Sequence, residues 1–127
     1  MVRHYCILGA GGFLGSHLTE ALLRDSAGHE ATVTAVDTCF DKLAAPAAGE
    51  RLQRVRGSVA DEATLDEALH RPPYAVLSLT ALFNPALYNT RPREVFDANF
   101  THLIPLVDRC TAAGLRLIHF STCEVYG

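Results

Sequence analysis

The 127-residue sequence lacks the features of several protein classes. Its apolar runs are all far shorter than the roughly 20 residues that a membrane-spanning helix needs. Residues 1–8 run straight into glycines, without the layout of a signal peptide. The four cysteines form no C-x-x-C pair, and the six histidines form no H-x-x-H pair, so metal-site and disulfide-framework spacings are absent. We therefore expect no metal, no membrane partner and thiols in a reducing, cytoplasmic compartment.

Positive charge is also scarce. The 11 Lys and Arg residues are outnumbered by 14 Asp and Glu, which gives a formal charge of −3 and argues against a nucleic-acid partner. Lys42 is the sole lysine. Hydrophobic residues make up 49% and charged residues 20%, as in a soluble globular domain, and the length is that of one domain.

Strand patterns alternate with helix patterns along the whole chain. We predict strands at residues 3–8, 31–36, 52–56, 75–79 and 115–120. We predict helices from residue 13 to a stop at Gly28, at 62–70 capped by Asp61, and from Pro92 to about residue 113. This alternation predicts an α/β fold with a doubly wound parallel sheet of about five strands. Pro105 falls inside the last helix, where proline costs about 3 kcal/mol, and the pattern shows no compensating feature.

A glycine-rich turn follows the first strand and opens the first helix. Gly9, Gly12 and Gly15 have the spacing G-x-x-G-x-x-G. Backbone without Cβ atoms approaches a pyrophosphate closely, and the helix N-terminus offers free N–H groups to it. An ordinary tight turn uses glycines too, but the strand before it and the helix after it favour a Rossmann-like dinucleotide site.

Asp37 ends the second strand, about 20 residues beyond the glycines, where an acid bonds the adenosine ribose. A carboxylate there repels a 2′-phosphate, and no arginine follows it closely in the sequence. We therefore predict NAD as the cofactor, while Asp37 by itself could be an ordinary loop acid.

The sequence resembles the extended short-chain dehydrogenases/reductases, the NAD-dependent epimerase/dehydratase family of nucleotide-sugar enzymes. The resemblance rests on GAGGFLG at 9–15, Asp37, GSVAD at 57–61, LTA at 79–81, Asn99 and STCEVYG at 121–127. It implies a cofactor site made by Gly9, Gly12, Phe13, Leu14, Gly15, Asp37, Ser58, Val59, Leu79, Thr80, Ala81 and Asn99. Ser58 departs from the family, which usually has an aspartate next to the adenine.

Within the family, the sequence most resembles UDP-glucuronic acid decarboxylases, the oxidative ones in particular. The stretch at 84–92, NPALYNTRP, carries this likeness, and it implies substrate contacts by Pro85 and Tyr88. The resemblance also implies that Thr122 polarises the sugar oxygen at C4 and that Glu124 assists decarboxylation. Epimerases and dehydratases of the family remain alternatives, because dehydratases also place a glutamate at this position.

Each of these residues has a simpler interpretation. Asn99 faces the sheet on its helix, so it needs a polar partner, and a structural hydrogen bond would serve as well as a cofactor contact. Thr122 could satisfy backbone at a strand end, Glu124 could be a solvated loop acid and Tyr88 a surface aromatic.

The family's general acid and base, a tyrosine four residues before a lysine, has no counterpart here. We therefore expect residues 1–127 to be the NAD-binding part of a longer enzyme, and leave activity of this chain alone open. A non-catalytic dinucleotide-binding module, or a fragment that never folds alone, remains an alternative. The resemblance also implies a homodimer formed through the helix that carries Phe96, Phe100 and Val107. The last strand is expected to leave an open sheet edge.

Overall fold

The computed structural model describes residues 1–24, 28–44 and 46–126. The five strands are β1 (Val2–Leu8), β2 (Glu30–Asp37), β3 (Leu52–Arg56), β4 (Ala75–Ser78) and β5 (Leu117–His119). The α-helices are α1 (Phe13–Arg24), α2 (Glu62–Leu69), α3 (Pro85–Tyr88), α4 (Pro92–Asn99) and α5 (Ile104–Ala112). Three 3₁₀ segments complete the elements: η1 (Pro46–Arg51), η2 (Thr101–Leu103) and η3 (Cys123–Tyr126).

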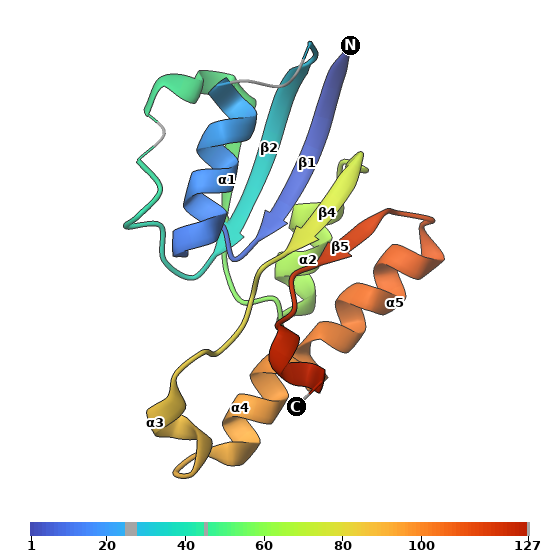
Figure 1. The fold of residues 1–127 in the computed structure, drawn as a ribbon. Coiled ribbons are helices and arrows are strands. Elements are labelled where there is room, and N and C mark those ends of the chain that lie inside the picture. The colour runs from blue at the N-terminus through green and yellow to red at the C-terminus, as the bar shows by residue number, and fades with distance from the viewer. Residues whose placement is uncertain (25–27, 45, 127) are drawn as a thin grey trace.

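All strands pair in parallel, in the order β3-β2-β1-β4-β5. The chain moves outward from β1 to β3 and then returns to the other side of β1 with β4 and β5 (Figure 1). Such a reversal leaves a crevice at the carboxyl ends of the two strands where the order changes, here β1 and β4. The sheet order confirms the predicted doubly wound α/β fold and places β5 at one edge of the sheet.

Two apolar layers pack on the two faces of the sheet. Alternate residues of β1 separate them, because successive side chains of a strand point to opposite faces. Tyr5 and Ile7 pack in the layer beneath α1, whereas Cys6 and Leu8 pack in the layer that includes residues of α2 and α5. Burial raises the pKa of the Cys6 thiol to about 12.

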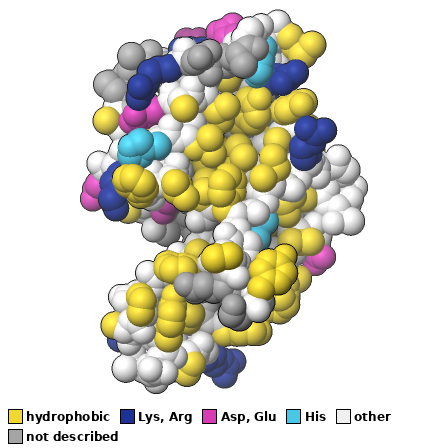
Figure 2. All heavy atoms as spheres, in the orientation of Figure 1, with side chains coloured by type: hydrophobic (Ala, Val, Ile, Leu, Met, Phe, Trp, Pro, Cys, Tyr) yellow, Lys and Arg dark blue, Asp and Glu magenta, His cyan; other side chains and the backbone are white. Residues whose placement is uncertain are grey.

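On the α1 side of the sheet, apolar side chains over the strands beside α1 form a broad surface (Figure 2). Ile118 of β5 is 43% exposed and Phe120 is 44% exposed. No helix in the described part of the chain is long and apolar enough to cross a membrane.

The prediction of one helix from Pro92 to about residue 113 is wrong. The segment breaks at Phe100, whose φ of −134° and ψ of −67° end α4, and η2 follows before α5 begins. Pro105 thus occupies the first turn of α5, where its missing N–H has no intrahelical partner to lose. The break explains how the chain accommodates this proline.

The prediction that the Asp61 carboxylate caps α2 is also wrong. Asp61 is the N-cap residue of α2, but its side chain makes no capping hydrogen bond. The helix starts there all the same, because the backbone of Leu65 bonds to the Asp61 carbonyl at 3.2 Å. The short helix α3 was not predicted. Helix α1 is described as far as Arg24, and the residues between it and the predicted stop at Gly28 lie outside the described part of the structure; Gly28 itself has a φ of +85°.

Candidate functional site

The glycine-rich turn joins β1 to α1 at the crevice between β1 and β4. The backbone N–H groups of Gly9 and Ala10 both donate to the Val36 carbonyl, at 2.9 and 3.1 Å, and so tie the turn to the end of β2. Gly9 has a φ of +83°, a conformation that favours glycine. The turn is therefore anchored from the neighbouring strand.

Close backbone packing explains two further glycines of this turn. A Cβ on Gly15 would lie 2.1 Å from the Gly9 carbonyl oxygen, and one on Gly11 would lie 1.7 Å from the Cys39 carbonyl oxygen. Gly12 differs, because its Cβ would meet only the Gly9 oxygen at 3.4 Å, an ordinary contact. Gly12 thus leaves open a space that the protein itself does not fill, as a backbone-bound phosphate requires.

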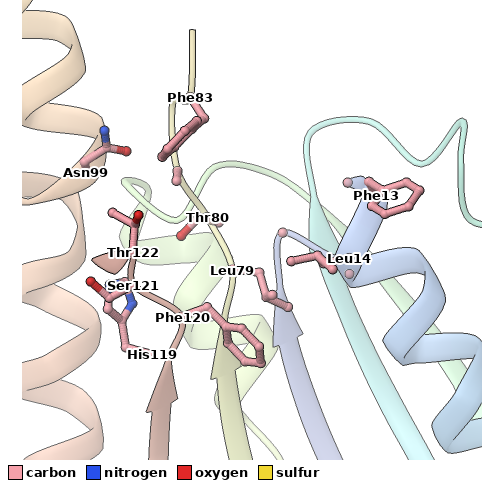
Figure 3. A pocket seen from close by; sticks show the side chains of 14 residues that line it. Phe13, Leu14, Leu79, Thr80, Phe83, Asn99, His119, Phe120, Ser121 and Thr122 are labelled. Atoms are coloured by element: carbon pink, nitrogen blue, oxygen red, sulfur yellow. The ribbon is translucent and has the colours of Figure 1, made fainter. Parts of the chain in front are cut away.

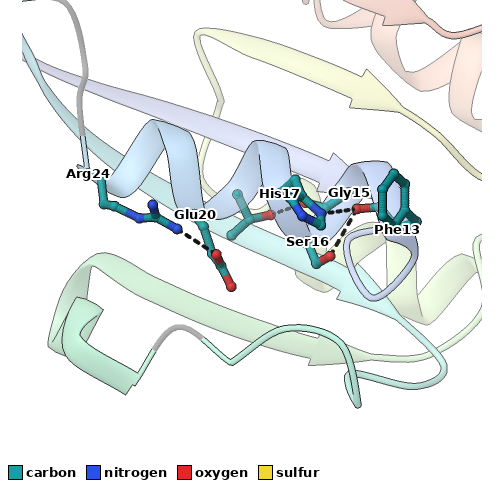
Figure 4. Close-up of polar contacts among 7 residues, drawn as sticks. Phe13, Gly15, Ser16, His17, Glu20 and Arg24 are labelled. Carbon is teal, nitrogen blue, oxygen red and sulfur yellow. Dashed lines mark hydrogen bonds and ion pairs between the residues drawn. The ribbon is translucent and has the colours of Figure 1, made fainter.

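The first turn of α1 suits an anion. It contains no acidic residue, and the free N–H groups of a helix N-terminus carry a positive partial charge. Figure 4 shows that the side chains along α1 bond to carbonyls instead: Ser16 and His17 donate to the Phe13 oxygen at 3.0 and 2.8 Å, and Thr19 donates to the Gly15 oxygen at 2.7 Å. These bonds use no N–H group of the first turn, where the Ser16 N–H bonds to the Gly12 carbonyl at 3.0 Å and the N–H groups of residues 13–15 remain for a ligand.

A cleft in two halves lies over this turn. Both halves are lined by Gly9, Gly12, Leu79, Thr80 and Ala81. The Thr122 half, of about 440 Å³, is also lined by Phe13, Leu14, Gly15, Phe83, Asn99, His119, Phe120, Ser121 and Thr122. The Asp37 half, of about 450 Å³, is also lined by Val36, Asp37, Thr38, Gly57, Ser58, Val59, Leu82, Glu94, Ala98 and His102. Two pockets that meet at a glycine turn have the shape that a dinucleotide needs.

Asp37 lies in the Asp37 half, at the end of β2. One carboxylate oxygen accepts from the N–H of Gly11 at 2.9 Å, and the other accepts from the N–H of Thr38 at 2.7 Å. The oxygen that accepts from Thr38 also receives longer bonds from the Thr38 hydroxyl and the Cys39 N–H, both at 3.4 Å. The oxygen that accepts from Gly11 keeps a lone pair for a ribose hydroxyl. Although no arginine closely follows Asp37 in the sequence, Arg56 lies opposite it in the register of β3 with β2 and donates to the Thr38 carbonyl at 3.1 Å.

Thr80 supplies an independent sign of a ligand. Its hydroxyl oxygen is buried and has no hydrogen-bond partner, which among the described residues is otherwise true only of Arg3 Nε. An unsatisfied buried hydroxyl costs about 1–3 kcal/mol. Because Thr80 lines both halves of the cleft, a polar ligand there would remove this cost. The residues present therefore fit a dinucleotide such as NAD.

Thr122 lies in the half named after it, directly after β5 and before η3 (Figure 3). His119, at the end of β5, lies beside the same half, and its Nδ1 is 3.2 Å from the hydroxyl of buried Ser78. The backbone of Glu124 belongs to η3, and its side chain falls outside the described part of the structure.

Asn99 is the last residue of α4, and its side chain is bonded to the loop after β4. Its Oδ1 accepts from the Leu82 N–H at 2.7 Å, and its Nδ2 donates to the Leu82 carbonyl at 3.2 Å. From the sequence, Asn99 could either make a structural hydrogen bond or contact the cofactor. The structure shows structural hydrogen bonds, and the cofactor contact stays a prediction. The Ser58 hydroxyl likewise accepts a local bond, from the Ala60 N–H at 3.2 Å.

The structure thus brings together all the residues predicted to bind the cofactor, together with Thr122. It does not bring Pro85 and Tyr88 to them, since both lie in α3, which projects with α4 away from the sheet (Figure 1). Sequence reasoning missed Phe83 and His119, which line the cleft, and did not single out Gly11 within the glycine motif, although its N–H donates to Asp37. The positions of Phe83 and His119 depend on contacts between distant segments, for which the sequence carries no local signal.

Comparisons with known proteins agree with this site. The profile described as "NAD dependent epimerase/dehydratase family" matches residues 5–127. A UDP-D-apiose/UDP-D-xylose synthase from Oryza sativa subsp. japonica is 41% identical over 96% of the chain, which spans 31% of that relative. The crystal structure of the PbgP3 protein from Burkholderia pseudomallei has a TM-score of 0.86 and 29% identity, covering 100% of this chain and 37% of that one.

A third relative was solved with a cofactor. The Bordetella bronchiseptica enzyme WbmG in complex with NAD has a TM-score of 0.78 and 27% identity, covering 100% of this chain and 40% of that one. The cofactor prediction is thus confirmed at the level of the family, whose description names NAD. The chain spans about a third of the length of the first relatives it matches. With the glycine turn, the two-part cleft and a profile that matches nearly its whole length, the chain belongs to the NAD-dependent epimerase/dehydratase family.

Proposed function

We propose that this chain is the NAD-binding part of an enzyme that oxidises and decarboxylates UDP-glucuronic acid. The observation that carries the proposal is the two-part cleft, with Asp37 in one half, Thr122 in the other and the open face of Gly12 between them. This order matches an adenosine, a pyrophosphate and a nicotinamide, with the sugar beside the nicotinamide.

The names of the relatives support the choice of substrate. The rice relative is a synthase of UDP-apiose and UDP-xylose, which carry five-carbon sugars. A hexuronic acid that loses its carboxyl group as CO₂ leaves a five-carbon sugar. Oxidation at C4 makes the carboxylate that of a β-keto acid, which loses CO₂ readily.

Each residue has a role in this scheme. The glycine turn and Asp37 would hold NAD, which would supply the hydride acceptor for C4 of the sugar. The Asp37 carboxylate would hold the adenosine ribose through the oxygen that accepts from the Gly11 N–H, which keeps a free lone pair. The hydroxyl of Thr122 would hydrogen-bond the C4 oxygen and favour the oxidised form, and Glu124 would assist the loss of CO₂. Ser58 would contact the adenine from the other half.

The test is a reaction of the full-length protein with NAD and UDP-glucuronic acid, followed by NMR of the nucleotide sugar and by CO₂ release. We expect CO₂ and a UDP-linked five-carbon sugar in equal amounts: a 4-keto sugar with one NADH, or a pentose where the hydride returns to C4 and no NADH remains. Thr122→Val should lower the rate at least tenfold. An inverted or dehydrated hexose would instead indicate an epimerase or a dehydratase. Tight NADH binding without conversion of any UDP-sugar would indicate a non-catalytic module and contradict the proposal.

We also propose that the enzyme is a cytoplasmic homodimer. The dimer face would be the apolar surface of α4, η2 and α5, which we define as Phe96, Phe100, Ile104 and Val107. These side chains are 58%, 57%, 44% and 46% exposed, respectively, and the two phenylalanine rings lie 5.3 Å apart. A second copy would remove this apolar surface from water. The free cysteines favour a reducing compartment.

A further inference from the structure

Phe83 is an exposed aromatic side chain on a firmly held backbone. The side chain is 64% exposed, yet its ring lines the Thr122 half of the cleft. In Figure 3 the ring lies on the side of the cleft where Asn99 and Thr122 are found, far from Phe13 at the first turn of α1. An exposed ring at this place has apolar area available for a ligand.

The residues on both sides of Phe83 are anchored. The backbone of Leu82 is held by its two hydrogen bonds with the Asn99 side chain, at 2.7 and 3.2 Å. Asn84 caps α3, and its side chain accepts from the Ala86 N–H at 3.1 Å. Anchors at the preceding and the following residue restrict the backbone of Phe83, so its ring keeps its place without burial.

We propose that the sugar ring of the nucleotide-sugar substrate packs against Phe83, and that Asn99 is a positioning residue that holds Phe83 through the backbone of Leu82. This inference rests on the proposed function. The C–H face of a pyranose is apolar and covers an aromatic ring, while its hydroxyl edge can reach polar groups such as Thr122. The nicotinamide is assigned to the opposite side of this half, next to the glycine turn and Leu14.

The two hydrogen bonds between Asn99 and Leu82 also limit what the Asn99 side chain can offer to the cofactor. One Oδ1 lone pair and one Nδ2 hydrogen are committed to Leu82. A variant that breaks this pair releases the loop that carries Phe83, whereas the glycine turn keeps its own anchor at Val36. The substitution should therefore weaken sugar binding, while NADH binding reports separately on the predicted cofactor contact of Asn99.

The experiment measures the binding of UDP, UDP-glucuronic acid and NADH to the full-length protein by calorimetry. For Phe83→Ala we expect about 5- to 30-fold weaker binding of UDP-glucuronic acid, with UDP and NADH unchanged within about twofold. Phe83→Tyr keeps the ring and should bind as the wild type does. Tyr74→Ala removes an aromatic ring that is 44% exposed and lines neither half of the cleft, and it should also leave all three affinities unchanged.

The role of Asn99 is tested by a double-mutant cycle. We expect Asn99→Leu to weaken UDP-glucuronic acid binding about as much as Phe83→Ala does, and the double variant to lose no more, because both act through one ring. Asn99→Asp keeps the acceptor for the Leu82 N–H but loses the donor to its carbonyl, so its loss of UDP-glucuronic acid affinity should be intermediate. This variant keeps the inference testable if Asn99→Leu does not fold.

The outcomes separate this inference from the proposed function. A wild type that binds neither UDP nor UDP-glucuronic acid overturns the proposed function and this inference with it. A wild type that binds both, with Phe83→Ala unchanged, overturns the inference alone. Weaker NADH binding by Phe83→Ala would place the cofactor at this ring and would also overturn it.

Discussion

Gly12 and Gly15 are both glycines of one turn, yet substitution by alanine should affect them in opposite ways. In Gly12→Ala the new methyl group meets only the Gly9 oxygen at 3.4 Å, so the free energy of unfolding should change by about 0.5 kcal/mol or less. In Gly15→Ala the methyl group would lie 2.1 Å from the same oxygen and 2.7 Å from the Ala10 Cα. Such overpacking should cost about 1–3 kcal/mol of stability.

Cofactor binding should follow the reverse order. The methyl group of Gly12→Ala projects into the space assigned to the pyrophosphate and would displace it from its hydrogen bonds. A lost hydrogen bond to a charged group costs about 1.5–3 kcal/mol, which is roughly a 10- to 150-fold loss of affinity. Gly12→Ala should thus keep its fold and lose NADH.

The assays are urea unfolding, followed by circular dichroism, and fluorescence titration with NADH. Both are made on the full-length protein, and a phosphate-free buffer avoids competition for the turn. A Gly12→Ala variant that binds NADH as tightly as the wild type would refute the assignment of the pyrophosphate to Gly12. A Gly15→Ala variant as stable as the wild type would refute the packing argument itself.

Three further predictions follow from other parts of the molecule. Asp37→Ala should weaken NADH binding roughly 10- to 150-fold in a fluorescence titration, and a wild type that prefers NADPH would contradict the ribose assignment. The pair Phe100→Asp and Val107→Asp should shift the protein from dimer to monomer in light scattering, because it places charge on the apolar face; a persistent dimer would locate the interface elsewhere. In the folded state, burial lowers the pKa of His4 from its ordinary 6.5, and the nearby charge of Arg71 lowers it further. The unfolded chain therefore binds more protons as the pH falls below about 6.5, and stability is lost on acidification. The urea midpoint should fall more between about pH 7 and about pH 5 in the wild type than in His4→Gln, and equal falls would exclude His4 as a cause.

Local signals in the sequence were sufficient for most of the fold. Apolar periodicity and the glycines that end or begin elements placed all five strands within two residues of their observed bounds at each end. The same periodicity concealed the break at Phe100, because the apolar stripe continues across it. Pro105 indicated that one continuous helix was unfavourable here. The break at Phe100 that accommodates this proline is set by packing, which the local sequence does not show.

Part of the candidate site could likewise be predicted from the sequence, and part of it could not. The glycine motif and Asp37 are sequence signals with a direct physical meaning, and the structure places them around one cleft. The bond between Asn99 and Leu82 joins residues 17 positions apart, and the position of Phe83 depends on it. The sequence showed that Asn99 needs a partner, but only the packing of the loop against α4 shows which one.

The position of the dinucleotide in a crystal structure of the protein with NADH tests the central claim most directly. The account predicts the adenosine ribose on the Asp37 carboxylate, the pyrophosphate over Gly12 and the nicotinamide in the half that contains Thr122. A dinucleotide bound outside this cleft, or one reversed so that its adenosine lies beside Thr122, would contradict the account.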